Sequence, residues 1–433
     1  MLSTQTQRRF PLHWQILAAI GAGALTGYLT GPDATLFGVS IVSVFDFLGT
    51  LFVNALKMLV VPLITASVIS GVASIGSPGD LGRLGGKTLL FYVITTLIAV
   101  LVALTLSNTV RPGLVDGQPA HDLLAFEVSA AEVSGKVERG AGSIVDTFLG
   151  IVPPNIIEAA MGNKLLGLVF FSILFGYFLA RIEPEYGKPV IGFWQGVFQV
   201  MMRMTEFVML LAPIGVFGLA ARTVAKTGFD AAGPLLLFSA TVLAGLLIYA
   251  VLLLPTLVRL VARVNPWPLF PAMAPALLTA FSTASSSATL AMSIDCTERR
   301  VGVSNRVCGF VMPLGASLNH AGSALYECAG AMFIAQAYGL QLSFGQQFTI
   351  VVLALITSMG IAGIPAASLV GIAVILTAVG LPAEAIGVLL VFDRILDMCR
   401  TAVNVFADAC CAVIVAKLEG EQGIPKPASE WNR

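Results

Sequence analysis

Long apolar runs alternate with short polar connections along most of the chain, for example at 41–72, 88–107 and 235–254. A run of about 18 or more apolar residues can cross a bilayer as a helix. The pattern therefore predicts an all-α polytopic membrane protein. A hydropathy window along the sequence predicts spans at about 12–32, 41–72, 88–110, 145–182 (broken), 189–222, 231–262, 304–338 and 383–418.

Two further apolar segments are interrupted at their centres by small and hydroxyl residues. Segment 267–298 contains "STASSSAT", and segment 342–381 contains "SMGIAGIPAAS". Non-helical backbone is tolerated in a bilayer only where it is buried in protein or lines a cavity. Two broken segments in corresponding positions predict re-entrant helical hairpins in an inverted repeat, with a substrate site near the midplane. Ordinary spans with a serine-rich kink are the alternative.

The composition agrees with a membrane protein. Hydrophobic residues make up 57% of the 433 residues, charged residues only 11%, and the mean hydropathy is +0.90, whereas a soluble domain carries about 25% charged residues. The 24 basic residues balance the 24 acidic ones, which gives no reason to expect a nucleic-acid partner. The six cysteines lack metal-ligand spacing and are interpreted as buried free thiols.

Basic residues cluster at alternate connections between the predicted spans. They are Arg8 and Arg9, Arg83 and Lys87, Arg181 and Lys188, and Arg259 and Arg263. The positive-inside rule therefore places both termini in the cytoplasm and the loop at 111–140 outside. The stretch 1–29 lacks a clear cleavage site and is interpreted as a retained first helix. We expect a multi-pass protein of the cell (inner) membrane.

The last predicted helix carries a stripe of polar side chains, which we call the polar row. At about 100° per residue, the row covers roughly 120° of the helix surface. Each ionisable group in mid-membrane costs about 2.5–3.5 kcal/mol, so five would cost on the order of 12–18 kcal/mol unless paired or hydrated. The row favours a substrate and ion pathway over an internal salt-bridge network between Asp397 and Arg400. Its members are Asp393, Arg394, Asp397, Arg400, Thr401, Asn404 and Asp408.

The residue types in the polar row indicate the chemistry of a ligand. Asp397 suits an ammonium group, and Arg400 suits a carboxylate bound through two parallel hydrogen bonds. The Asn404 amide can orient a second carboxylate, and Asp408 suits a small hard cation. Together these groups predict an acidic amino acid and a cation.

Five motifs together resemble the glutamate/aspartate transporter family, the dicarboxylate/amino acid:cation symporters. The resemblance covers nearly the full length and implies eight spans plus two re-entrant hairpins in inverted repeats. It also implies a homotrimer in which a transport domain moves like an elevator against a scaffold. The motifs are "SSSATL" (285–290), "PLGASLN…G" (313–322), "ALYE…FIAQ" (324–336), "GIAGIP" (360–365) and "LDMCRTAVNVFADA" (396–409).

The same resemblance implies a division of the chain. Scaffold helices would occupy 1–86 and 145–222. The transport domain would comprise 87–144, which holds the third helix and the outside loop, and 223–433, which holds both hairpins and the last helix.

Substrate contacts follow from the resemblance residue by residue. Asp397 would hold the ammonium group, and Arg400, helped by Ser323, the side-chain carboxylate. Ser286 and Asn404 would hold the α-carboxylate. The remaining residues would line the pocket or close over it as the extracellular gate: Thr401, Gly363, Ile364 and Pro365.

The resemblance also implies cation sites, and no organic cofactor. Asp408 with the backbone carbonyls of Gly315, Asn319 and Asn404 would form a candidate Na⁺ site. A second site is degenerate, because Ala321 stands where the family has an aspartate. Without that carboxylate, the site's remaining groups bind a hard cation weakly. They are Tyr92, Thr95 and Thr96.

Protons are the alternative coupling ion. Glu327 lies where the animal relatives carry a proton on a glutamate, and His320 replaces a methionine of the family. A buried carboxyl group or an imidazole can exchange protons near neutral pH, although each can equally be a neutral interior group. The family often supplies a second arginine where this chain has Ala284 and Met398; Arg394 is a candidate substitute.

These observations predict a secondary transporter that takes up aspartate or glutamate, with sodium coupling weakened or lost and proton coupling in its place. Its partners would be the substrate, H⁺ or Na⁺, membrane lipid and further copies of the chain. A sodium-coupled dicarboxylate transporter or a neutral amino-acid exchanger is the nearest alternative. A channel is more distant. An intramembrane enzyme is disfavoured because "SSSAT" has no base beside it.

Overall fold

The structure is a computed structural model that describes residues 12–74, 81–124, 126, 133, 152–161, 165–230, 232–360 and 367–431. Regular structure in these residues is helical apart from two short antiparallel hairpins, which confirms the all-α prediction. One hairpin pairs β1 (Thr35–Leu36) with β2 (Val39–Ser40), and the other pairs β3 (Leu114–Val115) with β4 (Gln118–Pro119).

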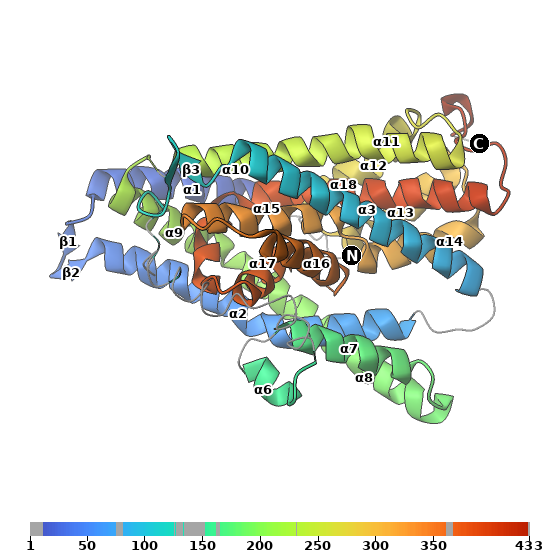
Figure 1. Ribbon diagram of the computed structural model, residues 1–433, viewed down its shortest axis with the longest axis horizontal. Helices are drawn as coiled ribbons and strands as arrows, with labels where there is room; N and C mark the ends of the chain where they lie inside the picture. Colours follow the sequence, from blue (N-terminus) through green and yellow to red (C-terminus); the bar gives the residue numbers. More distant parts are fainter. Residues whose placement is uncertain are drawn as a thin grey trace, which may run out of the picture.

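The helices of the N-terminal half have two kinds of neighbour. Most pack against one another: α1 lies against α9, and α2 lies against α7, α8 and α9 (Figure 1). α3 instead packs against helices of the C-terminal half. The bounds are α1 (Leu12–Thr30), α2 (Ile41–Ser74), α3 (Leu81–Val110), α6 (Ile156–Met161), α7 (Leu165–Leu179), α8 (Pro184–Leu210) and α9 (Ala212–Thr227).

The C-terminal half surrounds α18, the helix that carries the polar row. α18 contacts α10, α12, α13, α14, α15 and α3. The bounds are α10 (Ala232–Leu247), η1 (Ile248–Leu253), α11 (Leu254–Leu257), η2 (Val258–Ala262), α12 (Leu269–Thr283), α13 (Ser286–Asp295), η3 (Cys296–Val301), α14 (Asn305–Leu318), α15 (Ala321–Ala337), α16 (Phe344–Gly360), α17 (Ala367–Ala378), η4 (Ala383–Val388), α18 (Leu390–Leu418) and η5 (Ala428–Glu430).

Three helical stretches of the described chain are long and apolar enough to cross a membrane: 84–110, 232–262 and 390–418. α8 and α9 pass the same test only as a pair, bent by 50° at Leu211. The predicted span at 189–222 is therefore not straight; Pro213 follows the bend directly and lacks the N–H that would continue the helix. The predicted count of eight spans stays a prediction.

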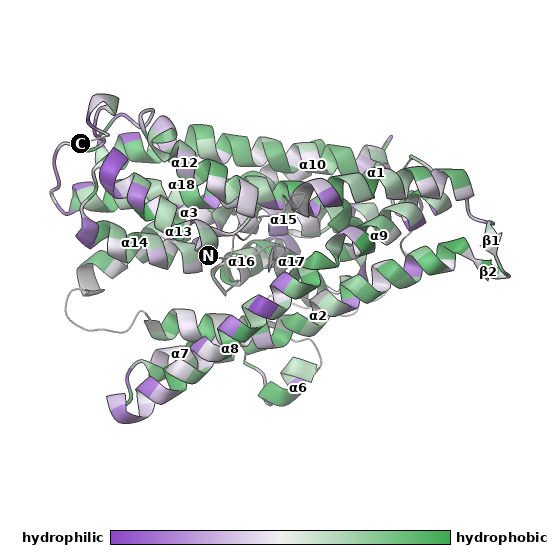
Figure 2. Cartoon of the chain, turned by 180° about the vertical axis from the view of Figure 1, so that it is seen from behind, coloured by the Kyte–Doolittle hydropathy of each residue, from purple (hydrophilic) through white to green (hydrophobic). Residues whose placement is uncertain are grey.

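Apolar side chains also cover much of the outer surface. Leu29, Phe193 and Leu252 expose 73%, 62% and 61% of their surface. Hydrophobic colour dominates the helix bodies, and hydrophilic colour gathers near the C-terminus and at the α7–α8 connection (Figure 2). Exposed apolar surface of this extent is expected where lipid, not water, surrounds the helices.

The first of the two segments with interrupted centres contains a helix break. In the first, α12 ends at Ala284 in the left-handed region (φ 51°), and Ser285 caps α13 by accepting a hydrogen bond from the Ala288 N–H at 3.2 Å. α12 and α13 then pack against each other. In the second, α16 ends at Gly360 and α17 begins at Ala367. The predicted break in the first segment is confirmed, whereas residues 361–366 at the centre of the second lie outside the described residues. The re-entrant path through a membrane stays a prediction.

The segment at 304–338 differs from the single span predicted there. α14 ends at Leu318, and α15 begins at Ala321 after two residues with non-helical backbone, Asn319 and His320. The Asn319 side chain donates to Asp408 of α18 at 2.8 Å. This interhelical bond holds the chain at the break, close to the polar row.

Glycines of α1 allow it to lie directly on α9. A Cβ added to Gly23 would stand 2.6 Å from the Phe217 carbonyl oxygen, whereas a Cβ on Gly21 would meet nothing within 4 Å. We expect Gly23→Leu to separate α1 from α9 and to lower the free energy of unfolding by about 1–3 kcal/mol. Thermal unfolding in detergent measures this. Gly21→Leu, on the exposed face of the same helix, is the matched control; equal melting temperatures for the two variants would contradict the expectation.

Candidate functional site

The centre of the polar row is a buried ion cluster on α18. Arg400 Nη2 donates to Asp397 Oδ1 at 2.9 Å and to Asp393 Oδ1 at 3.0 Å. All three side chains are buried, and Arg400 has no solvent exposure. The salt bridge that the sequence offered as an alternative is therefore present in this structure.

The salt bridge nevertheless leaves Arg400 only partly satisfied. Its Nε and Nη1 have no hydrogen-bond partner among the described residues. The guanidinium carbon lies 3.8 Å from the centre of the Tyr326 ring on α15, a cation–π contact. Because a guanidinium offers five N–H donors in a planar fork, Arg400 retains the capacity to bind a further carboxylate.

The part of the row that is C-terminal to the ion cluster contacts the start of α15. Asn404 Oδ1 accepts from the Gly322 N–H at 2.8 Å, and Asn404 Nδ2 lies 3.5 Å from Ser323 Oγ. A Cβ on Gly322 would stand 3.1 Å from the Asn404 oxygen. Thr401 Oγ1 donates to the Asp397 carbonyl of its own helix at 2.8 Å. The structure thus brings Ser323, Thr401 and Asn404 beside the ion cluster; their contacts with a substrate stay a prediction.

Asp408 lies at the C-terminal end of the row, among several of the predicted cation ligands. Its Oδ1 accepts from Asn319 Nδ2, and a Cβ on Gly315 would overlap its carboxylate and stand 2.7 Å from the Tyr92 hydroxyl. Asp408 is 2% exposed. A carboxylate, a buried amide oxygen and nearby main chain supply the oxygen donors that a hard cation requires, so these residues fit the group that the sequence assigned to them.

Ala321 contributes no carboxylate to the second predicted cation site, although the Asp408 carboxylate and the Tyr92 hydroxyl both lie within 2.7 Å of the position that a Cβ on Gly315 would take. Tyr92 donates its hydroxyl to the Val311 carbonyl at 2.9 Å, and Thr95 donates to the Phe91 carbonyl at 2.8 Å. Thr96 Oγ1 is buried with no hydrogen-bond partner in the described chain, and Ala321 is fully buried. The carboxylate beside this site is thus the one that the first predicted site also uses, and a cation bound here would have no carboxylate of its own.

Glu327 of α15 contacts α16 and lies against α17. Its Oε2 accepts from Thr357 Oγ1 of α16 at 2.6 Å, and a Cβ on Gly371 of α17 would overlap its carboxyl group. Glu327 has no solvent exposure, and its Oε1 has no partner in the described part of the chain. The carboxyl group is thus placed where a change of its charge would act on both helices.

Of the other predicted site residues, His320 and Ser286 are buried, and the predicted gate residues are not described. His320 is 3% exposed, and neither ring nitrogen has a hydrogen-bond partner among the residues that the structure covers. Ser286 is buried at the first turn of α13, which packs against α18. The predicted gate residues Gly363, Ile364 and Pro365 lie outside the described residues.

Sequence reasoning missed two groups of the site. Asp393 belongs to the polar row, but the sequence analysis predicted no contact for it. Its position seven residues before Arg400 places it on the same helix face. Tyr326, which faces the guanidinium, gave no such signal because it belongs to a different helix. Only the packing of α15 on α18 brings that ring to Arg400.

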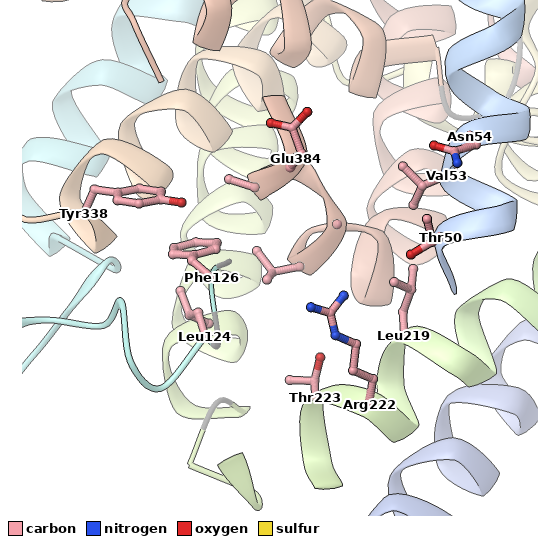
Figure 3. Close-up of a pocket in the computed structure, with 13 residues that line it drawn as sticks. Thr50, Val53, Asn54, Leu124, Phe126, Leu219, Arg222, Thr223, Tyr338 and Glu384 are labelled. Carbon is pink, nitrogen blue, oxygen red and sulfur yellow. The ribbon is translucent and has the colours of Figure 1, made fainter. Parts of the chain in front are cut away.

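A cavity of about 190 Å³ lies away from the polar row, between α2 and α9 on one side and η4 with the end of α15 on the other (Figure 3). Arg222 points into it from α9, and Tyr338 and Phe126 stack in its wall with ring centres 4.7 Å apart. None of the predicted site residues lines this cavity.

Apolar helices around a buried row of charges define a membrane protein that handles a small charged solute. The chain belongs to the sodium:dicarboxylate symporter family, whose model matches residues 12–418. The family resemblance found in the sequence is thereby confirmed, and the chain is a multi-pass membrane protein. A symporter family agrees with the expectation that the protein is a transporter and not an enzyme.

Named relatives cover almost the whole chain. A proton/glutamate-aspartate symporter of Escherichia coli (strain K12) is 34% identical over 412 residues, 95% of this chain and 93% of its own. A proton/sodium-glutamate symport protein of Bacillus caldotenax is 36% identical over 96% of both chains. Excitatory amino acid transporter 1 of Ambystoma tigrinum is 34% identical over 86% of this chain and 77% of its own.

The closeness of α14 to Asp408 gives a test of the cation site. Gly315→Ala would push a methyl group into the Asp408 carboxylate, whereas Gly309→Ala on the same helix meets nothing within 4 Å. We expect Gly315→Ala to reduce cation-dependent substrate uptake at least tenfold and to destabilise the fold by about 1–3 kcal/mol. Proteoliposome uptake and thermal unfolding measure the two effects. Gly309→Ala should match the wild type; uptake by Gly315→Ala at the wild-type rate would rule out a cation role for this cluster.

Proposed function

We propose that the protein takes up aspartate or glutamate across the cell membrane as a secondary active symporter. The observation that carries the proposal is the buried Asp393–Asp397–Arg400 cluster, whose guanidinium keeps two nitrogen atoms without a hydrogen-bond partner in the described chain. A buried carboxylate and a buried guanidinium together match the ammonium and carboxylate groups of an acidic amino acid. The printed names of the relatives, which include glutamate and aspartate symporters, support the same substrates.

Protons are proposed as the coupling ion, with sodium coupling weakened or lost. The support is twofold. Ala321 gives the second cation site no carboxylate of its own, and the fully buried Glu327 holds one oxygen with no partner in the described residues. A relative named as a proton/glutamate-aspartate symporter agrees with this choice. The Asp408 cluster would still bind one Na⁺ where sodium contributes.

Movement is proposed to follow the elevator scheme in a homotrimer, with α1, α2 and α7–α9 as scaffold and α3 and α10–α18 as the moving part. The contact pattern supports this division, because each set packs extensively within itself and only sparsely against the other. α8 exposes Phe193, Val200 and Phe207, an apolar face suited to lipid or to a neighbouring copy. Both termini are proposed to lie in the cytoplasm.

Purified protein in liposomes tests substrate and coupling together. We expect L-aspartate or L-glutamate to accumulate in sodium-free buffer when an inward proton gradient is applied. Glu327→Gln should abolish this accumulation while leaving exchange of internal for external substrate, because an amide cannot carry a proton. Glu206→Gln, on an exposed side chain of α8, is the control. Strict dependence of wild-type uptake on several sodium ions would overturn the proton proposal.

Arg400 decides between an acidic and a neutral substrate. We expect Arg400→Cys to lower acidic amino-acid uptake by a factor of about 30 or more, since removing one partner of a buried charge pair costs about 2–5 kcal/mol. Arg203→Cys is a matched control, because Arg203 lies on the exposed face of α8. Uptake of L-aspartate, L-glutamate and L-serine by both variants measures the effect. Unchanged acidic uptake by Arg400→Cys would contradict the role of Arg400 in binding the side-chain carboxylate.

A further inference from the structure

The Glu327 carboxyl group belongs to a row of three buried oxygen atoms. Thr357 Oγ1 lies 2.6 Å from Glu327 Oε2 on one side and 2.7 Å from the Leu353 carbonyl oxygen of its own helix on the other. Both distances fall within the 2.5–3.0 Å of an O–H···O hydrogen bond. Thr357 is 2% exposed, and Glu327 has no solvent exposure. The protons of this row therefore come from the two side chains themselves.

Two short contacts need two protons, and Thr357 supplies only one. A hydroxyl group has a single O–H donor, and a carbonyl oxygen has none. An ionised Glu327 can only accept, so one of the two contacts would then join oxygen atoms with no proton between them. A protonated Glu327 donates to Thr357 Oγ1 and leaves the threonine proton for the Leu353 carbonyl. The geometry of the row thus fits the protonated form of Glu327.

A second threonine of α16 shows where a helical threonine sends its proton. Thr349, which is also buried, donates from Oγ1 to the Gly345 carbonyl four residues earlier at 2.9 Å. This is an ordinary bond of a threonine within a helix. Thr357 makes the same bond to Leu353 at a shorter distance. Because its proton is engaged there, the contact with Glu327 needs a second donor.

Few titratable groups surround Glu327. α10, α16 and α17 pack against α15, and none of them has an acidic, basic or other titratable side chain in its described length. Tyr92 and Lys87 of α3 bond to other groups, and Cys328 of α15 is a buried thiol. α18 presents Arg400, which acts on Glu327 electrostatically but already pairs with two carboxylates of its own helix. A proton is therefore the cation best placed to neutralise Glu327.

We propose that Thr357 is a positioning residue that links the proton on Glu327 to the packing of α16 against α15. With the proton bound, Glu327 donates to Thr357 and Thr357 donates to Leu353, so both contacts are hydrogen bonds. When the proton leaves, one contact loses its hydrogen bond and a buried anion remains, which is unfavourable. The O–H bond of Glu327 is the bond that forms and breaks, and its proton comes from one aqueous phase and leaves to the other.

This inference rests on the proposed proton coupling and adds the group that responds to the charge of Glu327. α16 is the first arm of the segment whose centre carries the predicted gate, and α17, its second arm, lies against the same carboxyl group at Gly371. A protonated Glu327 would hold α16 through two hydrogen bonds. An ionised Glu327 would hold it through one and would favour its separation from α15.

The pH at which Glu327 takes up its proton tests the link. Thr357→Val replaces the hydroxyl group with a methyl group, Thr357→Ser keeps the hydroxyl, and Thr349→Val is the matched control on the same helix. Infrared difference spectra of the protein in liposomes follow the C=O stretch of protonated carboxyl groups during a pH titration. Loss of one band in Glu327→Gln assigns that band to Glu327. Uptake of labelled L-aspartate driven by a proton gradient is measured at the same pH values.

We expect the midpoint of the Glu327 band in Thr357→Val to move toward acid by about 0.5–1 pH unit, which corresponds to one hydrogen bond. Removing the hydroxyl costs the protonated form two hydrogen bonds. It costs the ionised form one charge-assisted bond but also relieves the contact that has no proton. The band should move to higher frequency, because the acid loses its acceptor, and the uptake midpoint should follow the band midpoint. Thr357→Ser and Thr349→Val should match the wild type.

Other results would overturn the inference. A midpoint that moves toward alkaline pH would mean that Thr357 serves the ionised carboxylate, and an unchanged midpoint with slower uptake would give Thr357 a purely structural role. An unchanged band frequency in Thr357→Val, an equal shift in Thr349→Val, or no Glu327 band at any pH would each contradict the proposed row of protons. If Thr357→Val does not fold, as judged by size-exclusion chromatography, Thr357→Ala makes the same comparison.

The two measurements separate this inference from the proposed function. Wild-type uptake that ignores the proton gradient would overturn the proposed coupling, whereas the infrared titration needs no transport. A Glu327 band that responds to Thr357 in a protein without proton-driven uptake would leave the link between the two residues standing.

Discussion

The structure depends on keeping charged groups buried in an apolar helix bundle. Two aspartates and two arginines of the polar row stand within the eight residues 393–400 of α18, and Arg400 has no solvent exposure. Their formal charges sum to zero, but the pairing is uneven, because Arg400 contacts two carboxylates and Arg394 only approaches one. The ion pairs offset part of the cost of burying these charges, and the cluster still has polar atoms that could bind a charged ligand.

This constraint accounts for the broken helices around α18. A continuous helix hides its main-chain N–H and C=O groups in its own hydrogen bonds, so only a break can offer them to a neighbour. The break at Asn319–His320 sends one side chain to Asp408, and the free N–H of Gly322 at the start of α15 donates to Asn404. The break after Ala284 places Ser286 at the first turn of α13. The breaks in α12–α13 and α14–α15 therefore deliver polar groups to the row.

Much of this arrangement could be predicted from the sequence. Hydropathy located most helices to within a few residues, and the serine-rich centre at 282–289 located the first break, because both signals are local. The split at Asn319–His320 could not be predicted from its neighbours, since its cause is a hydrogen bond to a residue 89 positions away. Tyr326 was missed for the same reason, because the Arg400 guanidinium meets its ring only through the packing of two helices.

The proposed proton coupling follows from the same charge balance. An acidic amino acid brings one net negative charge to a cluster that is formally neutral, so the loaded site needs a cation from elsewhere. Ala321 contributes no charge to the second cation site, whereas Glu327 lies fully buried between α16 and α17 and can be neutralised by a proton. A charged carboxylate at that position would be unfavourable in an apolar surrounding. Under the proposal, proton binding at Glu327 would couple the loading of the site to the packing of the helices on either side of the predicted gate.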